Sequence, residues 1–344
     1  MRIAVLAPAW FPVPPPGYGG IEWVVWLLAD GLVDAGCDVT LFSVGQSRTR
    51  AKLEYLFEEA PSEEIGRTFP ELRHALACYA RHEEFDLIHD HTGLLGAALG
   101  GAVETPVAHT VHGPVDGVPG VLYEQIAAIA PRVGLISISL NQRRPKPHLN
   151  WIANCPNAIA FDLYPFSPHR GDYLFFLGRM SPEKGAHRAV RTAVETGLPL
   201  KMAAKMREPA EKEYFDAYVK PHLGPEIEYL GEVSHGEKVE LLQHARATLF
   251  PIEWEEPFGL VMLESMACGT PVIASRWGSV PEVVEPGRSG VIVDDWGDAA
   301  AALEQADLIT PESCRAYALE RFTPERMVQD YRAAYDLLLA ERSG

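Results

Sequence analysis

The sequence is short of cysteine and of basic side chains, and both shortages exclude classes of protein. Its five cysteines are widely spaced and form no CxxC pair, which argues against a disulfide framework or a zinc site and is typical of a reducing cytoplasm. Thirty lysines and arginines stand against 47 aspartates and glutamates, for a formal net charge of -17. Because so acidic a surface repels phosphates, we expect neither nucleic acid nor an anionic membrane as a partner.

Long apolar runs are missing as well. No stretch of about 20 apolar residues occurs, so no integral membrane segment is expected. The apolar segment 2–7 is too short for a signal peptide, and we expect a cytoplasmic chain. One short basic cluster is present and is more typical of a solvated loop than of a binding face: Arg143, Arg144, Lys146 and His148. Nothing in the sequence indicates an oligomeric state.

What the chain does contain is a regular alternation of strand-like and helix-like segments. In the first half we expect strands at 2–7, 38–44, 86–89, 106–111 and 133–138, and helices at 20–35, 71–82, 92–103 and 121–130. In the second half we expect strands at 173–178, 199–204, 227–230, 246–251, 271–275 and 290–293, and helices at 184–196, 209–222, 235–245, 258–268 and 298–306. Apolar runs separated by helices predict parallel sheets covered on both faces.

A length of 344 residues favours two domains, and a proline-rich interruption marks the boundary. We expect a Rossmann-like domain at 1–156, a linker at 157–171, a second Rossmann-like domain at 172–322, and a final helix at 323–344 that packs back toward the first domain. The predicted fold class is α/β, with two doubly wound domains facing a central cleft. Ligands of such sheets bind outside the carboxyl ends of the strands, so the cleft is the expected site.

The most specific motif, EPFGLVMLESMACGTPVI at 256–273, follows the expected strand at 246–251. Pro257 suits the first turn of a helix because it has no amide hydrogen, and Gly259 permits a ligand to approach the backbone. The helix start at 258–260 would therefore present free N–H groups to an anion or a sugar. Eight residues separate Glu256 from Glu264, at most about 12 Å along a helix. One carboxylate could bind sugar hydroxyls and the other a ribose diol.

Two further motifs place glycines or cations at strand ends. GRMSPEKG at 178–185 offers Arg179, which can bind phosphate oxygens bidentately, and Lys184, which adds a point charge; a helix cap with solvated charges is the alternative. In PPPGYGGIEW at 14–23, Gly19 and Gly20 permit close approach to phosphate or sugar. A tight turn that packs a helix on the sheet is the alternative there, and the motif is not a GxGxxG fingerprint.

Histidines gather at two other strand ends, in His89-Asp90-His91 and His109-Thr110-Val111-His112. A metal site is disfavoured because one of the first three side chains points away if the strand continues, and the second group has no carboxylate at ligand spacing.

Together these motifs resemble glycosyltransferase family 4, whose members adopt the GT-B fold. The string from Glu256 through Gly269-Thr270-Pro271 resembles the family's E-x7-E signature, and Arg179 with Lys184 resembles its phosphate-binding pair. The resemblance covers nearly the whole chain but is tight only in the second half. Its PPxGYGG opening is similar to short family members, some of which decorate natural products. The chain departs from the pattern at 157–159, where Asn-Ala-Ile replaces Asn-Gly-Ile, and at 203–204, where a glycine is common.

The resemblance implies a retaining, metal-independent transferase that moves a hexosyl group from a nucleoside-diphosphate sugar, with UDP the expected nucleotide, to a hydroxyl of a sugar, lipid or natural product. No cofactor is expected. The first domain would bind the acceptor and the second the donor. The implied catalytic residues are His112, Glu256, Arg179 and Lys184. The implied donor-binding residues are Gly19, Gly20, Arg179, Lys184, Val233, Glu256, Phe258, Gly259, Leu260 and Glu264. Acceptor contacts are expected from His91, Tyr18 and Trp23, although His91 and Trp23 could equally be packing residues.

Other functions stay open on the sequence. A GT-B sugar-nucleotide epimerase, a phosphorylase and a non-catalytic nucleotide-sugar binding protein share much of this pattern. The intact glutamates and cations argue against the non-catalytic protein, because a mere binder is free to lose them. An NAD dehydrogenase is disfavoured because the glycine loop has the wrong form.

Overall fold

The computed structural model describes residues 1–17 and 19–340, and the chain divides into two compact units. Unit 1 comprises Met1–Ile159 together with the segment that begins at Pro324, and unit 2 comprises Ala160–Thr323. The segment 157–171, expected as a linker, is therefore divided between the two units. The central cleft concerns the arrangement of the units and stays a prediction.

Unit 1 is built on a seven-stranded parallel sheet of order β3-β2-β1-β4-β5-β6-β7. Its strands are β1 (Arg2–Leu6), β2 (Asp38–Ser43), β3 (Lys52–Tyr55), β4 (Leu87–Asp90), β5 (Val107–Thr110), β6 (Gly134–Ser137) and β7 (Trp151–Asn154). The inner strands β4, β5 and β6 are buried along their whole length, as continuous apolar runs predict. The edge strands β3 and β7 were not predicted, because half-exposed edges lack such runs.

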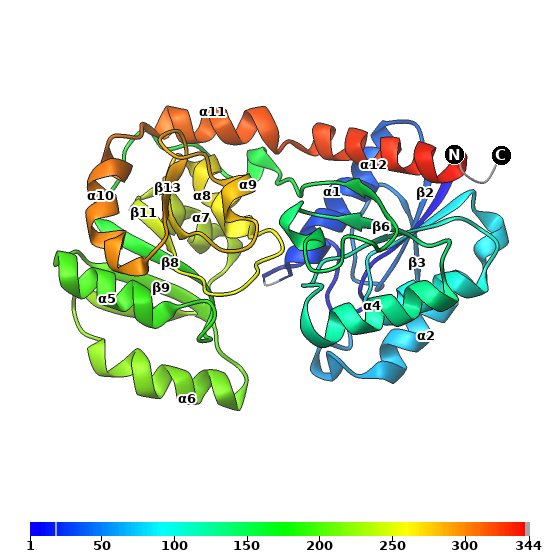
Figure 1. Ribbon diagram of the computed structural model, residues 1–344, viewed down its shortest axis with the longest axis horizontal. Helices are drawn as coiled ribbons and strands as arrows, with labels where there is room; N and C mark the ends of the chain where they lie inside the picture. Colours follow the sequence, from blue (N-terminus) through cyan, green and yellow to red (C-terminus); the bar gives the residue numbers. More distant parts are fainter. Residues whose placement is uncertain (18, 341–344) are drawn as a thin grey trace. The chain divides into compact units, whose positions relative to one another are not determined.

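Helices cover both faces of this sheet (Figure 1). On one face lie α1 (Gly20–Asp34) and α12 (Pro324–Ala340), which contact each other; α12 also contacts β7. The other face carries α2 (Thr68–Tyr79), α3 (Leu94–Leu99) and α4 (Gly117–Ile129). Helix α12 buries Tyr331 and Tyr335 completely, so the last helix of the chain is part of the core of unit 1.

Unit 2 contains a six-stranded parallel sheet of order β10-β9-β8-β11-β12-β13. Its strands are β8 (Tyr173–Arg179), β9 (Leu200–Lys205), β10 (Ile227–Gly231), β11 (Ala245–Phe250), β12 (Val272–Ser275) and β13 (Gly290–Val293). Its helices are α5 (Ala186–Thr196), α6 (Pro209–Tyr218), α7 (His235–Gln243), α8 (Leu260–Cys268), α9 (Val280–Val283), α10 (Ala299–Asp307) and α11 (Pro311–Arg321). Strands β8 and β11 are neighbours, so the loops that follow them start at one edge of the sheet.

Two helix starts in unit 2 differ from the sequence prediction. Helix α8 begins at Leu260, because Gly259 has a φ of 80° and stands outside the helix as its N-cap. The prediction that Pro257 occupies the first turn is therefore wrong, since Pro257 precedes the N-cap. Helix α5 likewise begins at Ala186, after Gly185 with a φ of 79°. In both cases a left-handed glycine turns the chain sharply into the helix.

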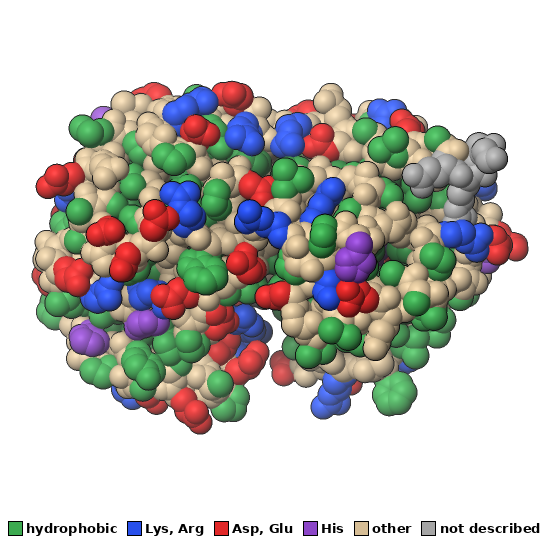
Figure 2. Space-filling model, in the orientation of Figure 1, with side chains coloured by type: hydrophobic (Ala, Val, Ile, Leu, Met, Phe, Trp, Pro, Cys, Tyr) green, Lys and Arg blue, Asp and Glu red, His purple; other side chains and the backbone are tan. Residues whose placement is uncertain are grey.

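The surface is consistent with the acidic composition. On the face that Figure 2 shows, lysine and arginine side chains lie among acidic ones. The basic cluster is not simply a solvated loop: Lys146 and His148 lie 2.8 and 3.1 Å from a carboxylate oxygen of Glu124, and Arg143 lies over the Trp151 ring at 5.6 Å. None of the helices described is both long enough and apolar enough to cross a membrane.

Candidate active-site residues

The cations of the GRMSPEKG motif lie where strand β8 ends and α5 begins. Lys184 forms an ion pair with Glu256, and its Nζ lies 4.6 Å from the centre of the Trp254 ring. The Lys184 and Glu256 side chains are only 18% and 10% exposed, so water screens their attraction weakly. The structure thus brings together two predicted site residues that are 72 positions apart in the chain.

Arg179 is the last residue of β8 and also has acidic neighbours. Its guanidinium lies 3.1 Å from a Glu183 carboxylate oxygen and 4.0 Å from one of Glu211. The nearby Arg188, on α5, donates to the carbonyl oxygen of Pro251 at 2.7 Å. Arg188 therefore ties the start of α5 to the end of β11, and it holds the GRMSPEKG motif next to the loop that carries Glu256.

Glu264, on α8, has a lysine partner of its own. The Lys238 Nζ lies 2.6 Å from the Glu264 Oε1, and the Tyr164 hydroxyl donates to the same oxygen at 2.7 Å. Burial, followed by the charge of Glu264, raises the pKa of Tyr164 well above its ordinary value. Each glutamate of the E-x7-E motif thus has one lysine neutralising it. Sequence reasoning missed Lys238 and Tyr164, and no spacing pattern links them to Glu264.

The start of α8 is an uncapped helix N-terminus. Gly259 has no side chain to accept from the first N–H groups, and no other side chain of the described residues caps this end. Leu260 is half-buried, whereas the Phe258 side chain is buried and packs at 6.1 Å from the Phe322 ring. Phe258 can therefore contact a ligand only through its backbone atoms. Val233, the predicted base contact, is half-buried and lies directly before Ser234, the N-cap of α7.

In unit 1 the paired glycines begin α1. Gly19, at a φ of 149°, is the N-cap, and Gly20 is the exposed first residue. A Cβ on Gly19 would lie 2.8 Å from the Pro15 Cγ and 2.9 Å from the Glu22 Oε2, so a side chain does not fit there. Trp23 is half-buried and packs edge-on against Trp26 at 5.6 Å. The predicted acceptor residue Tyr18 lies outside the described residues.

Glu22, in the first turn of α1, is a candidate that sequence reasoning quoted but did not select. Its side chain is buried, and burial raises its pKa to about 7. A carboxyl that titrates near neutrality beside a glycine loop is typical of functional sites. An acidic residue two positions after a glycine pair is the signal that would have found it.

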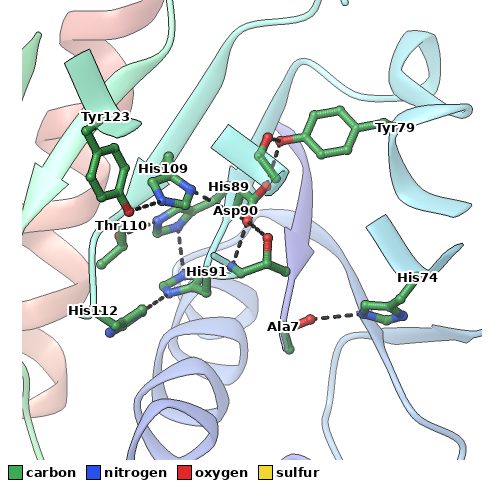
Figure 3. A network of polar contacts seen from close by, with 12 residues as sticks. Ala7, His74, Tyr79, His89, Asp90, His91, His109, Thr110, His112 and Tyr123 are labelled. Atoms are coloured by element: carbon green, nitrogen blue, oxygen red, sulfur yellow. Dashed lines mark hydrogen bonds and ion pairs between the residues drawn. The ribbon is translucent and has the colours of Figure 1, made fainter. Parts of the chain in front are cut away.

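His89 on β4, His91 directly after β4 and His112 after β5 form a connected group (Figure 3). The His91 Nδ1 lies 2.9 Å from the His112 Nε2, and the His91 Nε2 lies 3.2 Å from the His89 Nδ1. Burial, and then the charges of neighbouring histidines, lowers the pKa of His89 and of His112 to about 3 and the pKa of His91 well below its ordinary value. These three imidazoles are therefore neutral at physiological pH.

Asp90 points away from this group, as Figure 3 shows. Its carboxylate accepts from Tyr79 at 2.7 Å and from the hydroxyl of Thr92 at 2.7 Å, and it lies 3.6 Å from the His109 Nδ1. Burial opposes its ionisation, but these neighbours together hold its pKa below the ordinary value. Among the described residues, no three His, Cys, Asp or Glu side chains are placed to hold a metal ion.

Comparisons with known protein families give two matches, one for each half of the chain. The model described as "Glycosyltransferase Family 4" matches residues 18–159, and the model described as "Glycosyl transferases group 1" matches residues 165–318. A curated relative from Pseudarthrobacter chlorophenolicus, a D-inositol 3-phosphate glycosyltransferase, is 25% identical over 97% of this chain and 96% of its own length.

Solved structures match over nearly the full length. AviGT4, a glycosyltransferase involved in avilamycin A biosynthesis, is 28% identical with a TM-score of 0.72, covering 99% of this chain and 98% of its own. Anabaena HepE, solved in complex with UDP and glucose, has a TM-score of 0.76 and 18% identity, covering 98% of this chain and 99% of its own. At 18% identity, the similarity to HepE is evidence for a shared fold only.

Proposed function

Because this chain belongs to glycosyltransferase family 4 and has the GT-B fold, we propose that it transfers a hexosyl group from UDP to a hydroxyl acceptor. The reaction retains the anomeric configuration and uses no metal. The acceptor is a hydroxyl of a sugar, lipid or natural product. A D-inositol 3-phosphate glycosyltransferase and an avilamycin glycosyltransferase among the relatives support a small polyhydroxylated acceptor, and the HepE complex supports UDP as the nucleotide.

The observation that carries this proposal is the pairing at the carboxyl edge of the unit 2 sheet. Lys184 with Glu256 and Lys238 with Glu264 bracket the uncapped start of α8, and Arg179 lies at the end of the neighbouring strand. Cations, free N–H groups and carboxylates are the groups that a pyrophosphate, a sugar and a ribose need. Glu264 accepts from the ribose diol, and the backbone at Glu232-Val233 contacts the base.

Lys184 exchanges partners when the donor binds. Without a donor, Glu256 neutralises this cation. A diphosphate carries more charge and more acceptor oxygens than one carboxylate, so it draws the Lys184 ammonium away from Glu256. The released carboxylate then accepts from hydroxyls of the donor sugar. Binding of the two halves of the donor is thereby coupled through one ion pair.

The chemical step is departure of the diphosphate from the anomeric carbon. Arg179, Lys184 and the first N–H groups of α8 stabilise the negative charge that develops on the leaving oxygen, and such preorganised electrostatics are a large term in catalysis. The acceptor attacks from the face that the diphosphate leaves, and a leaving-group oxygen takes the acceptor proton. Gly19 and Gly20 admit the donor close to the backbone, and His112 contacts the sugar near the reacting carbon.

The test has two stages. A thermal-shift panel of UDP, GDP, ADP and TDP sugars selects the donor, since a ligand at 100 times its dissociation constant stabilises a protein by about 2.7 kcal/mol. Transfer is then assayed with that donor on an inositol, sugar and natural-product acceptor panel, with and without a chelator, and NMR reads the anomeric configuration of the product. Retention and chelator-insensitive turnover are expected.

Alanine variants then test the residues. Lys184→Ala and Glu264→Ala should lower kcat/KM for the donor by about a hundredfold or more. Lys220→Ala is the matched control, because Lys220 pairs with Asp216 on an exposed surface. An inverted product would refute retention, and near-normal kinetics in both site variants would refute the donor-binding assignment.

A further inference from the structure

Two imidazoles, those of His91 and His89, link His112 to helix α12. The His112 Nε2 lies 2.9 Å from the His91 Nδ1, the His91 Nε2 lies 3.2 Å from the His89 Nδ1, and the His89 Nε2 lies 2.8 Å from the Thr110 Oγ1 (Figure 3). Each ring therefore turns its Nε2 toward the next group. We call His112, His91 and His89 the histidine chain. Its inner end meets α12, where the Tyr335 hydroxyl lies 2.7 Å from the His89 Nδ1.

The contact of Tyr335 with His89 determines which nitrogen of each ring in the histidine chain carries the proton. The ring of Tyr335 is fully buried, and within the described part of the chain the only hydrogen-bond partner of its hydroxyl is the His89 Nδ1. The Thr110 hydroxyl donates to the Tyr331 hydroxyl at 3.3 Å, so the Thr110 oxygen is left to accept from the His89 Nε2. The His89 Nδ1 then carries no proton, and the Tyr335 hydroxyl donates to it. His89, which is neutral, then bears its proton on Nε2 and donates it to Thr110.

The tautomers of His91 and His112 follow from the tautomer of His89. The bare His89 Nδ1 faces the His91 Nε2, and two lone pairs at 3.2 Å would repel, so the His91 Nε2 carries the proton. A neutral imidazole has one N–H, so the His91 Nδ1 is an acceptor. It accepts from the His112 Nε2, which leaves the His112 Nδ1 without a proton. Burial keeps all three rings neutral, as their lowered pKa values indicate.

We propose that Tyr335, through His89 and His91, is a positioning residue that holds His112 in the tautomer whose Nδ1 accepts a hydrogen bond from a substrate hydroxyl. The proposal rests on the proposed role of His112 at the substrate. In this tautomer the His112 Nδ1 accepts a hydrogen bond from a hydroxyl and does not donate one. If the protons of the histidine chain pointed the other way, the His112 Nδ1 would carry a hydrogen and would favour a substrate group that can only accept.

Tyr331 provides a matched control on the same helix. Like Tyr335 it is fully buried on α12, but its hydroxyl lies 3.3 Å from the Thr110 Oγ1, beyond the end of the histidine chain. In the inferred arrangement Thr110 donates to Tyr331, so removing the Tyr331 hydroxyl leaves the Thr110 oxygen free to accept from His89. Tyr331→Phe and Tyr335→Phe each remove one buried hydroxyl from the same helix, but only Tyr335→Phe removes the donor to the His89 Nδ1.

The direct test is NMR of the full chain labelled with 15N-histidine, in which protonated and bare ring nitrogens resonate far apart. The His112 signals are assigned with the His112→Ala variant. The wild type should show a bare Nδ1 and a protonated Nε2 on His112, and Tyr331→Phe should show the same. Tyr335→Phe should shift both nitrogens toward the average of two exchanging tautomers. A protonated Nδ1 in the wild type, or unchanged nitrogens in Tyr335→Phe, would overturn the inference.

Kinetics connect the tautomer to the substrate. Tyr335→Phe should lower kcat/KM by about tenfold, as is usual when a partner that orients a site residue is lost, while Tyr331→Phe stays within about twofold and both variants melt at similar temperatures. Equal losses in the two variants would mean a purely structural role and would refute the proposal. If no donor and acceptor support turnover in the wild type while NMR shows the predicted tautomer, it is the proposed function that fails.

Discussion

At the residue scale, the two lysine–glutamate pairs have different consequences from the ion pairs on the surface. Lys238 and Glu264 are 16% and 9% exposed, whereas Lys220 and Asp216 are 62% and 59% exposed. Removing one member of a mostly buried pair leaves the other charge desolvated and without compensation. Removing one member of an exposed pair leaves a charge that water solvates.

This difference predicts the outcome of a pair of substitutions. Lys238→Met should lower the free energy of unfolding by about 3 kcal/mol and weaken donor binding, because it leaves the mostly buried Glu264 carboxylate without its compensating charge. Lys220→Met should cost less than about 1 kcal/mol and leave donor binding unchanged. Urea denaturation and donor titration measure both effects. Equal and small losses in the two variants would show that Lys238 does not neutralise Glu264.

Sequence motifs can predict part of the site at this scale. Arg179, Lys184, Glu256 and Glu264 lie in two contiguous strings at strand ends, so local pattern and family resemblance suffice to select them. Lys238 and Tyr164 contact Glu264 from segments 26 and 100 residues away, and only the packing of α7 and of the segment before β8 brings them there. No periodicity in one sequence contains that information.

At the element scale, left-handed glycines set the start of the helices that carry the site. Gly185 and Gly197 flank α5 at its two ends, with φ of 79° and 67°. A Cβ on Gly185 would lie 2.2 Å from the Pro251 carbonyl oxygen and 2.7 Å from the Arg188 Nε, whereas a Cβ on Gly197 would meet nothing within 4 Å. The two positions share backbone strain but differ in close contact.

Alanine at the two positions should therefore separate strain from crowding. Gly197→Ala should cost about 1 kcal/mol of unfolding free energy, which is the left-handed penalty of an ordinary residue. Gly185→Ala should cost clearly more, because the backbone of the β11 loop must move, and it should also weaken donor binding by displacing Lys184. Thermal denaturation and donor titration of both variants test this. A Gly185→Ala protein as stable and as active as Gly197→Ala would contradict the role given to this turn.

Element prediction succeeds where burial is continuous and fails at edges. The inner strands and most helices of both units follow from apolar runs and helical periodicity. Strands β3 and β7 are exposed or half-buried along their length, so their sequences resemble loops. Helix α11 has a Thr310 cap and Pro311 at its first position, but it buries only Cys314, Tyr317 and Ala318. That apolar face is too sparse to mark a helix by periodicity.

At the scale of the whole molecule, buried titratable groups make stability depend on pH. The pKa of His89 and of His112 is lowered to about 3, and that of His91 is lowered well below its ordinary value. Below the unfolded pKa of about 6.5 the unfolded chain therefore takes up protons that the folded chain does not bind. Stability then falls as pH falls. Glu22 acts in the opposite sense, because its folded pKa of about 7 lets the folded chain bind a proton first.

The balance of these groups predicts acid lability. Between about pH 7.5 and about pH 5.5 the three histidines lower the free energy of unfolding by about 4 kcal/mol, and Glu22 raises it by about 2 kcal/mol. The net fall from these four groups should therefore be about 2 kcal/mol. Glu22→Gln removes the opposing carboxyl, and its loss over the same range should be about twice as large. Calorimetric melting at the two pH values measures this. A protein that is equally stable at both would contradict the buried, neutral state of the histidine chain.

The central claim is that Arg179, Lys184 and the uncapped start of α8 in unit 2 bind the diphosphate of a sugar nucleotide. Isothermal titration of the full chain with UDP and with uridine, alongside the Arg179→Ala/Lys184→Ala double variant, tests it most directly. The account predicts that UDP binds the wild type at least about a hundredfold more tightly than uridine does, and that the double variant loses this difference. Equal affinity of UDP for the wild type and the double variant would contradict it.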